Sequence, residues 1–295
     1  MQKENCLIMK STAGFYYVRS EDGEITECRA RGVFRKQKIS PLVGDRVTVE
    51  INGDSGTVAN ICERKNFLVR PPVANLDKLI IVSSVVEPQP NLFIIDKLTA
   101  MAVDKGIEPV VVFSKDDLAD AGEYVEIYSR AGIQSFSVSS VTGEGIDRLR
   151  GVFENSVCAL TGNTGVGKSS VLNALDPELS LATAHISNKL GRGRHTTRTV
   201  ELYEMCGGYI ADTPGFSSLD FENIEIIVKE NLQFCFPEFE EYIGKCKFVS
   251  CAHLCEKGCR ICEAVKDGKI PSTRHESYRM MYDEVKDYKE WENRQ

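Results

Sequence analysis

The segment SVCALTGNTGVGKSSVL, residues 156–172, decides the fold of this chain. Its opening run SVCAL (156–160) is short and apolar, which predicts a buried strand. The pattern G-x-x-x-x-G-K-S follows at 162–169, and between a strand and a helix this pattern is a phosphate-binding loop. Its glycines let backbone N–H groups converge on phosphate oxygens, and the helix N-terminus adds positive potential. The residues predicted to form this site are Gly162, Asn163, Thr164, Gly165, Val166, Gly167, Lys168, Ser169 and Ser170.

A second phosphate element is predicted after the strand GGYIA (207–211), where the chain reads Asp212-Thr213-Pro214-Gly215. An acidic residue at a strand end can hold Mg²⁺ through water, and the backbone N–H of Gly215 can reach a γ-phosphate. Lys168 is then expected to bridge the β- and γ-phosphates, and the Ser169 hydroxyl to ligate Mg²⁺. D-x-P-G alone is an ordinary turn. Its position after a phosphate loop favours the role in metal and phosphate binding.

Two loops that precede the phosphate loop are assigned to recognition of the base. Ser114, Lys115, Asp116 and Asp117 end the predicted strand PVVVF, and Ser139 and Ser140 end the next one. The Asp117 carboxylate can accept hydrogen bonds from the N1 and N2 edge of guanine, while the Lys115 stem lies against the base. A backbone N–H near Ser139 can meet the guanine O6. By itself S-K-D-D is more often an acidic loop or a helix cap, and only the phosphate elements reverse that preference.

The order of these elements is unusual. In an ordinary GTPase the base-reading loops follow the phosphate loops, whereas here they come first along the chain. A parallel α/β sheet tolerates the rearrangement, because the loops after its strands all lie along one rim. The sequence therefore predicts a permuted domain that binds GTP and GDP together with Mg²⁺.

Between the two phosphate elements lies the basic segment KLGRGRHTTRTV (189–200). Its glycines and threonines suit a switch loop that approaches the γ-phosphate and supplies one Thr to Mg²⁺, either Thr196 or Thr197. Without the neighbouring motifs, a solvated surface loop is an equally good interpretation.

Residues 14–62 have a different sequence pattern, typical of short strands and turns. Segments such as GFYYV and GDRVTVE are rich in β-branched and aromatic residues, and EDGE and NGDSG are turn signals. About five short strands in some sixty residues suggest an OB-fold barrel. A basic stripe lies between the second and third predicted strands and consists of Arg29, Arg31, Arg35, Lys36 and Lys38.

Alternating strands and helices begin near residue 78, and strand signals fade after Leu219. We expect helices at 91–105, 122–131 and 146–153, further helical structure over 223–243, and a polar terminal helix over 272–294. The fold class is thus multidomain α/β, with a barrel over 1–70, a permuted GTPase domain over 71–220, and a metal-binding helical domain over 221–295.

Five cysteines are crowded between residues 246 and 262. Cys246, Cys251, His253 and Cys259 form the pattern Cys-x4-Cys-x-His-x5-Cys, and three thiolates with one imidazole make a closed tetrahedral zinc set. One structural Zn²⁺ is therefore predicted, which stabilises a segment with little core of its own. Cys255 and Cys262 are also available, so counting alone does not fix the ligands.

Composition places the chain among ordinary globular proteins, with 42% hydrophobic and 27% charged residues. No apolar run reaches the length of a membrane span, and MQKENCLIMK has charges where a signal peptide needs an apolar core. We therefore expect a cytoplasmic protein with no membrane contact. A monomer is the expected state, although nothing in the sequence bears on the oligomeric state. The net charge of −7 does not exclude RNA binding, because one local basic face is enough to bind RNA.

Taken together, these motifs closely resemble the circularly permuted GTPases that depend on the small ribosomal subunit and act late in its maturation. The resemblance rests on FRKQKISPLVGDRV, VSSVTGEGID, GRGRHTT, DTPGF, the permuted order and the Cys/His pattern. It implies that the barrel and the zinc domain contact ribosomal RNA, and that the small subunit stimulates hydrolysis. It also implies that His195 helps catalysis, because Phe216 occupies the position of the usual water-orienting Gln. Ser114 stands where the family usually has Asn, which implies the loss of an amide that braces the base and the neighbouring loops. Arg198 stands where the family often has a third Thr.

Two other classes of function compete with this interpretation. A metabolic P-loop enzyme that phosphorylates a small molecule leaves the barrel, the basic loop and the Cys cluster unexplained. A nucleic-acid-binding module with a vestigial nucleotide site has no need of Lys168, Ser169 and Asp212 together. Stimulation of hydrolysis by small ribosomal subunits separates the three.

Overall fold

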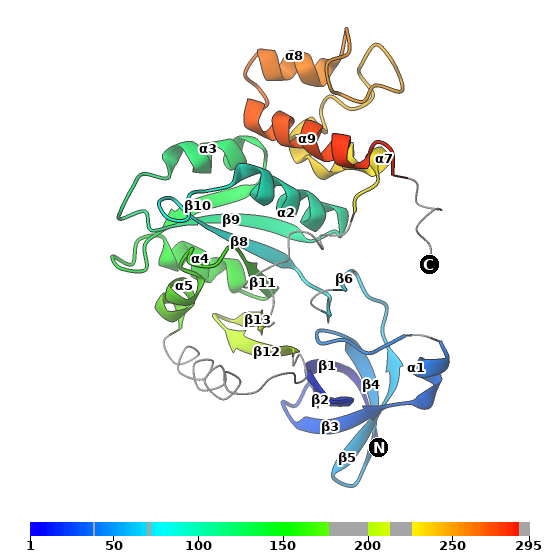
Figure 1. The fold of residues 1–295 in the computed structure, drawn as a ribbon. Helices are drawn as coiled ribbons and strands as arrows, with labels where there is room; N and C mark the ends of the chain where they lie inside the picture. The colour runs from blue at the N-terminus through cyan, green and yellow to red at the C-terminus, as the bar shows by residue number, and fades with distance from the viewer. Residues whose placement is uncertain (38, 70–71, 177–199, 213–225, 289–295) are drawn as a thin grey trace. The chain divides into compact units, whose positions relative to one another are not determined.

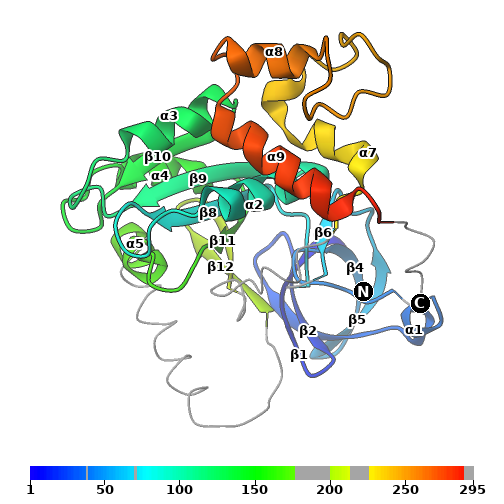
Figure 2. The same ribbon diagram turned by 45° about the horizontal axis from the view of Figure 1, so that its top comes forward.

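A computed structural model describes residues 1–37, 39–69, 72–176, 200–212 and 226–288. The chain divides into two compact units. The first contains Met1–Lys78, Ile146–Thr161 and Lys168–Ser218, and the second contains Leu79–Gly145, Gly162–Gly167 and Leu219–Gln295. The elements of each unit are drawn in Figures 1 and 2.

The N-terminal part of the first unit is a five-stranded barrel, as predicted. Its strands are β1 (Gln2–Thr12), β2 (Phe15–Arg19), β3 (Ile25–Ala30), β4 (Arg46–Asn52) and β5 (Ser55–Ile61). The barrel closes because β1 pairs with both β2 and β4, while β3 pairs with β5 in parallel. Strand β1 was not predicted. Its buried residues Cys6 to Met9 are consecutive rather than alternating, and its pairing with β4 shifts register between Lys3 and Cys6.

The remaining strands of the first unit carry the phosphate elements. Strand β11 (Val157–Thr161) pairs in parallel with β13 (Gly208–Asp212), and β12 (Val200–Met205) pairs antiparallel with β13. Strand β12 was also missed, although its buried residues Val200 and Leu202 alternate with the less buried Glu201 and Tyr203, because it begins within the basic segment that was assigned to a loop. The helices α4 (Ile146–Phe153) and α5 (Lys168–Leu175) belong to this unit, and α4 has the predicted bounds. The described part of this unit also contains a short helix α1 (Gly32–Lys36) and the strands β6 (Phe67–Leu68) and β7 (Val73–Ala74).

The second unit begins with three strands in the order β10-β9-β8. These are β8 (Lys78–Ser84), β9 (Glu108–Ser114) and β10 (Gln134–Val138), and β9 and β10 run parallel. Six consecutive residues of β9 are buried, as expected for a strand covered on both faces. Two predicted helices are confirmed as α2 (Leu92–Asp104) and α3 (Gly122–Arg130). The side chain of Asn91 caps α2 by accepting from the N–H of Ile94.

The C-terminal part of the second unit is less helical than predicted. The described part of 223–243 contains only α7 (Lys229–Leu232) and the 3₁₀ turns Gln233–Cys235 and Pro237–Phe239. Pro237 interrupts the helix, because the residue before a proline disfavours helical backbone, and Phe236 is extended. Helices α8 (Arg260–Lys266) and α9 (Ser272–Val285) follow. Helix α9 ends earlier than predicted, and 289–295 lie outside the described residues.

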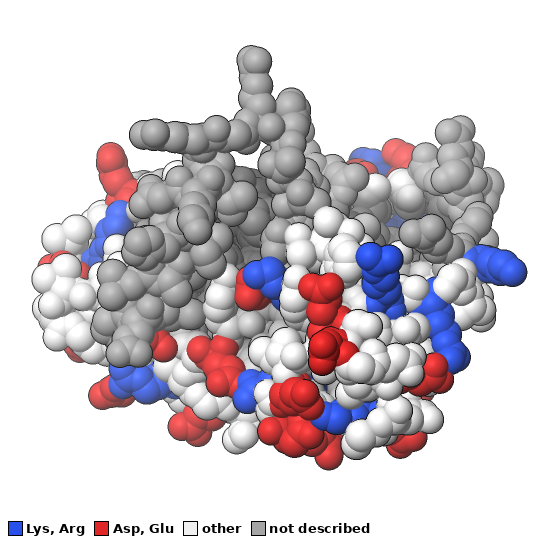
Figure 3. All heavy atoms as spheres, turned by 90° about the horizontal axis from the view of Figure 1, so that it is seen from below, with Lys and Arg blue, Asp and Glu red and all other residues white. Residues whose placement is uncertain are grey.

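The charges of the described surface are mixed. Figure 3 shows Lys and Arg side chains intermixed with Asp and Glu over the described atoms of one face. In the barrel, the Arg29 guanidinium lies 4.7 Å from the centre of the Phe15 ring, and Arg31 pairs with Glu50 at 2.6 Å. Among the helices that the structure describes, none is long and apolar enough to cross a membrane.

Candidate functional site

The phosphate loop follows β11 and leads into α5, as its motif predicts. Gly162 has φ +144°, and a Cβ there would lie 2.1 Å from the carbonyl oxygen of Val82. Only glycine therefore permits the loop to leave the strand so close to β8. Gly165 and Gly167 have φ of +83° and +90°, a region that L side chains rarely adopt. This backbone needs the glycines of the motif and turns the loop toward the start of α5.

The predicted guanine loop is bonded directly to the phosphate loop. The buried Ser114 hydroxyl donates to the carbonyl of Val166, and it also lies 3.3 Å from the carbonyl of Ser83. The Lys115 ammonium donates to the carbonyl of Gly165 at 3.0 Å and to that of Glu87. Ser114 thus joins the two loops. The family resemblance had implied that this contact is lost, because Ser114 lacks the amide of the family's usual Asn.

The two predicted base-reading loops also lie next to each other. Strands β9 and β10 are parallel, so their carboxyl ends share one edge. The Ser139 hydroxyl donates to Asp117 Oδ1 at 2.6 Å and accepts from the N–H groups of Val141 and Thr142. Asp117 is exposed, and the hydrogen bond from Ser139 orients its carboxylate. It is therefore oriented yet open to a ligand.

Asp116 has a different environment from Asp117. Its carboxylate accepts from the N–H of Ala121 and from the Ser137 hydroxyl at 2.6 Å. The bond from Ala121 closes the turn between β9 and α3, and the bond from Ser137 ties that turn to β10. Lys115 adopts φ +64° at the start of that turn. Asp116 therefore shapes the loop, while Asp117 presents its carboxylate. Ser140 is half-buried beside Ser139.

The residues of the first unit that are predicted to bind metal and phosphate come from two neighbouring strands. Val157 to Ala159 of β11 pair in parallel register with Tyr209 to Ala211 of β13. Asp212 is the last residue of β13, and Lys168, the first residue of α5, follows β11 along the chain. Burial lowers the pKa of the Lys168 ammonium from its ordinary value. Ser169 and Ser170 are exposed at the start of α5. Gly215, His195, Thr196 and Thr197 lie outside the described residues.

The structure brings the four predicted metal ligands together. The ligand atoms of Cys246, Cys251, His253 and Cys259 all lie within 4.8 Å of one another. His253 Nδ1 is 3.6 Å from the Sγ atoms of both Cys246 and Cys259, and these sulfurs are 3.9 Å apart. A tetrahedral zinc with bonds of ~2.3 Å to sulfur and ~2.0 Å to nitrogen requires S···S of ~3.8 Å and S···N of ~3.5 Å. The three spacings among Cys246, His253 and Cys259 are within ~0.1 Å of that geometry.

Neighbouring groups orient these ligands. The other ring nitrogen of His253, Nε2, is 2.9 Å from Gln233 Oε1, an arrangement that directs Nδ1 toward the sulfurs. The N–H of Arg260 points at Cys246 Sγ at 3.3 Å, and that of Cys262 at Cys259 Sγ at 3.5 Å. The Cys262 thiol lies instead near the carbonyl of His253, and Cys255 is exposed. Neither joins the group of four.

Comparison with known proteins matches this arrangement over nearly the whole chain. The family model described as RsgA GTPase matches residues 61–222, and the RsgA N-terminal domain matches residues 5–58. The chain belongs to the RsgA GTPase family. As a member of that family it is a P-loop GTPase, and the RsgA fold of barrel, circularly permuted GTPase domain and C-terminal Cys/His cluster is the one predicted.

Individual RsgA relatives are similar along their full length. A protein of Geobacillus sp. (strain WCH70), "Small ribosomal subunit biogenesis GTPase RsgA", is 46% identical over 96% of this chain and 97% of its own. The crystal structure of YloQ, described as a circularly permuted GTPase, has a TM-score of 0.80 at 35% identity, covering 98% of this chain and 96% of that one. YjeQ from Thermotoga maritima has a TM-score of 0.84 at 34% identity, covering 98% and 100%.

Some residues that shape the predicted guanine and metal sites carry no sequence motif. The carbonyl of Glu87 accepts from Lys115, and Gln233 faces the imidazole of His253. The Glu256 carboxylate accepts from the N–H groups of Ala252 and Leu254. Burial raises the pKa of Glu256, but these backbone donors outweigh it and hold that pKa below its usual value. A backbone carbonyl has no sequence signal, and an isolated Gln or Glu has only a weak one.

Proposed function

We propose that this GTPase binds the small ribosomal subunit and acts in its late maturation, hydrolysing GTP to GDP and phosphate at a rate that the subunit stimulates. The observation that carries the proposal is the bonded pair of loops, in which Ser114 and Lys115 hold the phosphate loop beside an oriented Asp117. Such a pair of loops can bind the base and the phosphates of one nucleotide at the same time. The printed name of the similar RsgA proteins supports the ribosomal role.

Guanine selection rests on Asp117 in this proposal. Its exposed carboxylate accepts from the N1 and N2 protons of guanine, which no adenine edge supplies. Ser139 fixes the rotamer of Asp117, and the Lys115 stem covers the base while its ammonium stays on Gly165. Ser114, Asp116 and Ser140 support the loops around the base.

The phosphate half follows the chemistry of P-loop GTPases. Backbone N–H groups of residues 162–167 surround the β-phosphate, and Lys168 neutralises charge on the β- and γ-phosphates. The Ser169 hydroxyl and the Asp212 carboxylate would hold Mg²⁺, and the N–H of Gly215 would contact the γ-phosphate. Mg²⁺ supplies the charge that stabilises the transferred phosphoryl group. Thr196 or Thr197 completes the metal ligands, and His195 positions the attacking water.

The C-terminal cluster is proposed to hold one structural Zn²⁺. Four ligands and no open position are typical of a structural rather than a catalytic zinc site. We propose the segments 1–70, 71–220 and 221–295 as barrel, GTPase and zinc-binding domains, and propose that the two flanking domains contact ribosomal RNA. A monomer in the cytoplasm, where small subunits are assembled, fits these partners.

A hydrolysis assay tests the proposal directly. Purified protein is incubated with radiolabelled GTP or ATP, with and without small ribosomal subunits, and with large subunits as the control. We expect slow GTP hydrolysis by the free protein, acceleration by small subunits alone, and no hydrolysis of ATP. Equal rates with both subunits would contradict the assigned partner, and equal use of ATP would contradict the assigned base.

A further inference from the structure

One buried charge cluster of the second unit takes no part in the nucleotide chemistry. Arg274 of α9 is fully buried, and its guanidinium donates to Asp96 Oδ1 of α2 at 2.7 Å and to Glu238 Oε1 at 2.7 Å. The side chains of Asp96 and Glu238 are 1% and 2% exposed. Thr99 accepts a further bond from Arg274 at 3.0 Å. An arginine at the centre of a protein is rarely retained without a role that an apolar residue cannot fill.

The cluster joins helices that are far apart along the chain, α2 and α3 with α9. The Tyr128 hydroxyl of α3 donates to Asp96 Oδ1 at 2.9 Å, and the guanidinium lies 4.7 Å from the centre of the Phe236 ring. Burial lowers the pKa of Arg274, but the two carboxylates outweigh it and hold that pKa above its ordinary value. Arg274 therefore stays charged while it connects α2 and α3 with α9 and the Pro237–Phe239 turn.

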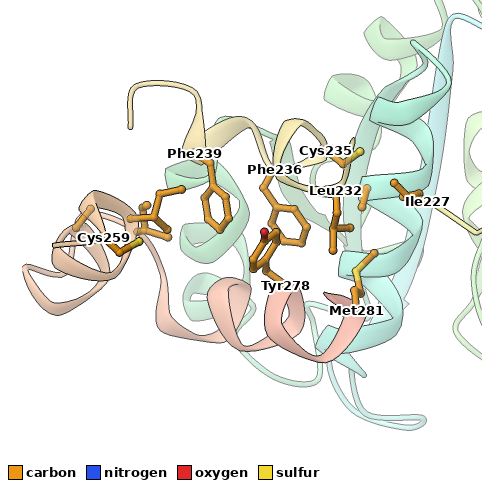
Figure 4. Close-up of a cluster of buried hydrophobic side chains, with 12 residues drawn as sticks. Ile227, Leu232, Cys235, Phe236, Phe239, Cys259, Tyr278 and Met281 are labelled. Carbon is orange, nitrogen blue, oxygen red and sulfur yellow. The ribbon is translucent and has the colours of Figure 1, made fainter. Parts of the chain in front are cut away.

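The same helix that carries Arg274 also holds the metal loop. His275 Nε2 lies 2.7 Å from the carbonyl of His253, and the Tyr278 hydroxyl donates to the carbonyl of Ala252 at 2.9 Å. The buried core is continuous across this helix, from Cys259 past Phe239 and Tyr278 to Ala100 of α2. Figure 4 shows Cys259, Phe239, Phe236 and Tyr278 in that row.

The helices that carry the other partners of Arg274 begin close to the guanine loops. Helix α2 starts after the loop in which the carbonyl of Glu87 accepts from Lys115. Helix α3 starts directly after the turn in which Ala121 donates to Asp116. A displacement of α2 or α3 at Arg274 therefore reaches the loops that are proposed to bind guanine.

Stability alone does not explain the cluster. A buried ion pair gives little net stabilisation compared with apolar residues of the same volume. Asp96 Oδ2 is buried with no hydrogen-bond partner among the described residues, which adds a desolvation cost. What charged partners supply better than apolar ones is a single permitted orientation of the packed elements.

We propose that Arg274 is a positioning residue that couples the metal loop to α2 and α3, so that the metal site and the guanine site open as one cooperative unit. The inference rests on the proposed function of both sites. Coupling of this kind is reciprocal: a nucleotide that stabilises the guanine loops also slows opening of the metal loop, and metal binding tightens nucleotide binding.

The test follows two probes while the full-length, zinc-loaded protein is heated. A chromogenic chelator reports zinc release, and the fluorescence of labelled GDP reports nucleotide loss. We expect both changes at the same temperature in the wild type, and we expect saturating GDP to raise the temperature of zinc release by several degrees. In Arg274→Lys the charge remains, but one ammonium cannot replace the planar guanidinium between Asp96 and Glu238. Zinc release is then expected at lower temperature and without a shift by GDP.

Lys97→Ala is the matched control. Lys97 of α2 pairs with Glu284 of α9 at 2.7 Å, so it joins the same two helices from the surface, and its loss is expected to change neither probe. Hydrogen exchange of residues 92–104 in the wild type gives a measurement independent of any variant, and stripping zinc is expected to speed it.

Each contrary result is distinguishable. A wild type that binds labelled GDP but releases zinc in a separate transition, insensitive to GDP, overturns the coupling alone. Wild-type behaviour of Arg274→Lys overturns the role of Arg274. A wild type that binds no labelled GDP overturns the proposed nucleotide site together with the coupling.

Discussion

Removal of the Ser114 hydroxyl tests the contact between the guanine loop and the phosphate loop. Ser114 is 2% exposed, and its single proton is donated to the carbonyl of Val166 or to that of Ser83. Ser114→Ala therefore leaves one buried carbonyl without its donor, at a cost of ~1 kcal/mol. Lys115 still holds Gly165, so the loops stay near each other but are no longer fixed.

If nucleotide binding fixes the two loops again, the free energy of fixing them lowers the nucleotide affinity by the same amount. One kcal/mol corresponds to about a five-fold change in a dissociation constant. Equilibrium titration of labelled GDP into Ser114→Ala is thus expected to give a dissociation constant raised about five-fold. Ser135→Ala is the control, since Ser135 is equally buried and donates to Val125 in α3, away from the loops.

The two variants are expected to lose similar thermal stability, but only Ser114→Ala is expected to lose affinity. Unchanged affinity in Ser114→Ala, beside a loss of stability equal to that of Ser135→Ala, would refute the inference that this hydroxyl preorganises the nucleotide site. A loss of affinity in both variants would show that the effect comes from general destabilisation.

Three further predictions concern single groups. Asp117→Asn is expected to weaken GTP binding by ~1.5–3 kcal/mol and to relax discrimination against xanthosine nucleotides, since the amide cannot accept both guanine protons; titration measures both, and unchanged GTP affinity removes Asp117 from the site. Elemental analysis is expected to find one zinc per chain, lost in Cys251→Ser and kept in Cys255→Ser; the reverse pattern would mean that the ligands are wrongly assigned. His195→Ala is expected to lower subunit-stimulated hydrolysis ~10²–10⁴-fold in single-turnover assays while GTP affinity stays near normal, and a wild-type rate would contradict the role of His195.

The sequence predicted those parts of the fold whose signals are local. The phosphate loop, the base-reading loops and the four metal ligands are each compact patterns, and α4 has the predicted bounds because its apolar positions recur at helical spacing. Strand β1 escaped prediction because Cys6 to Met9 are consecutively buried in a barrel strand that pairs on two sides. The helix expected over 223–243 is interrupted at Pro237, which disfavours helical backbone at Phe236, and this effect is local enough to be predicted from the sequence.

Contacts between distant segments could not be predicted. Asp96 and Arg274 are 178 residues apart, and nothing in either helix pattern marks them as partners. Likewise, the substitution of Ser for the family's Asn at position 114 implied a lost brace, whereas the hydroxyl bonds to the carbonyl of Val166. Such interactions depend on how separate elements pack, which a single sequence does not contain.

Single-turnover hydrolysis of radiolabelled GTP, with saturating small ribosomal subunits and without them, tests the central claim most directly. The permuted nucleotide site and the similarity to RsgA proteins predict slow hydrolysis by the free chain and a large acceleration by small subunits. An equal rate with and without small subunits, in a protein shown to bind GTP, would contradict the account.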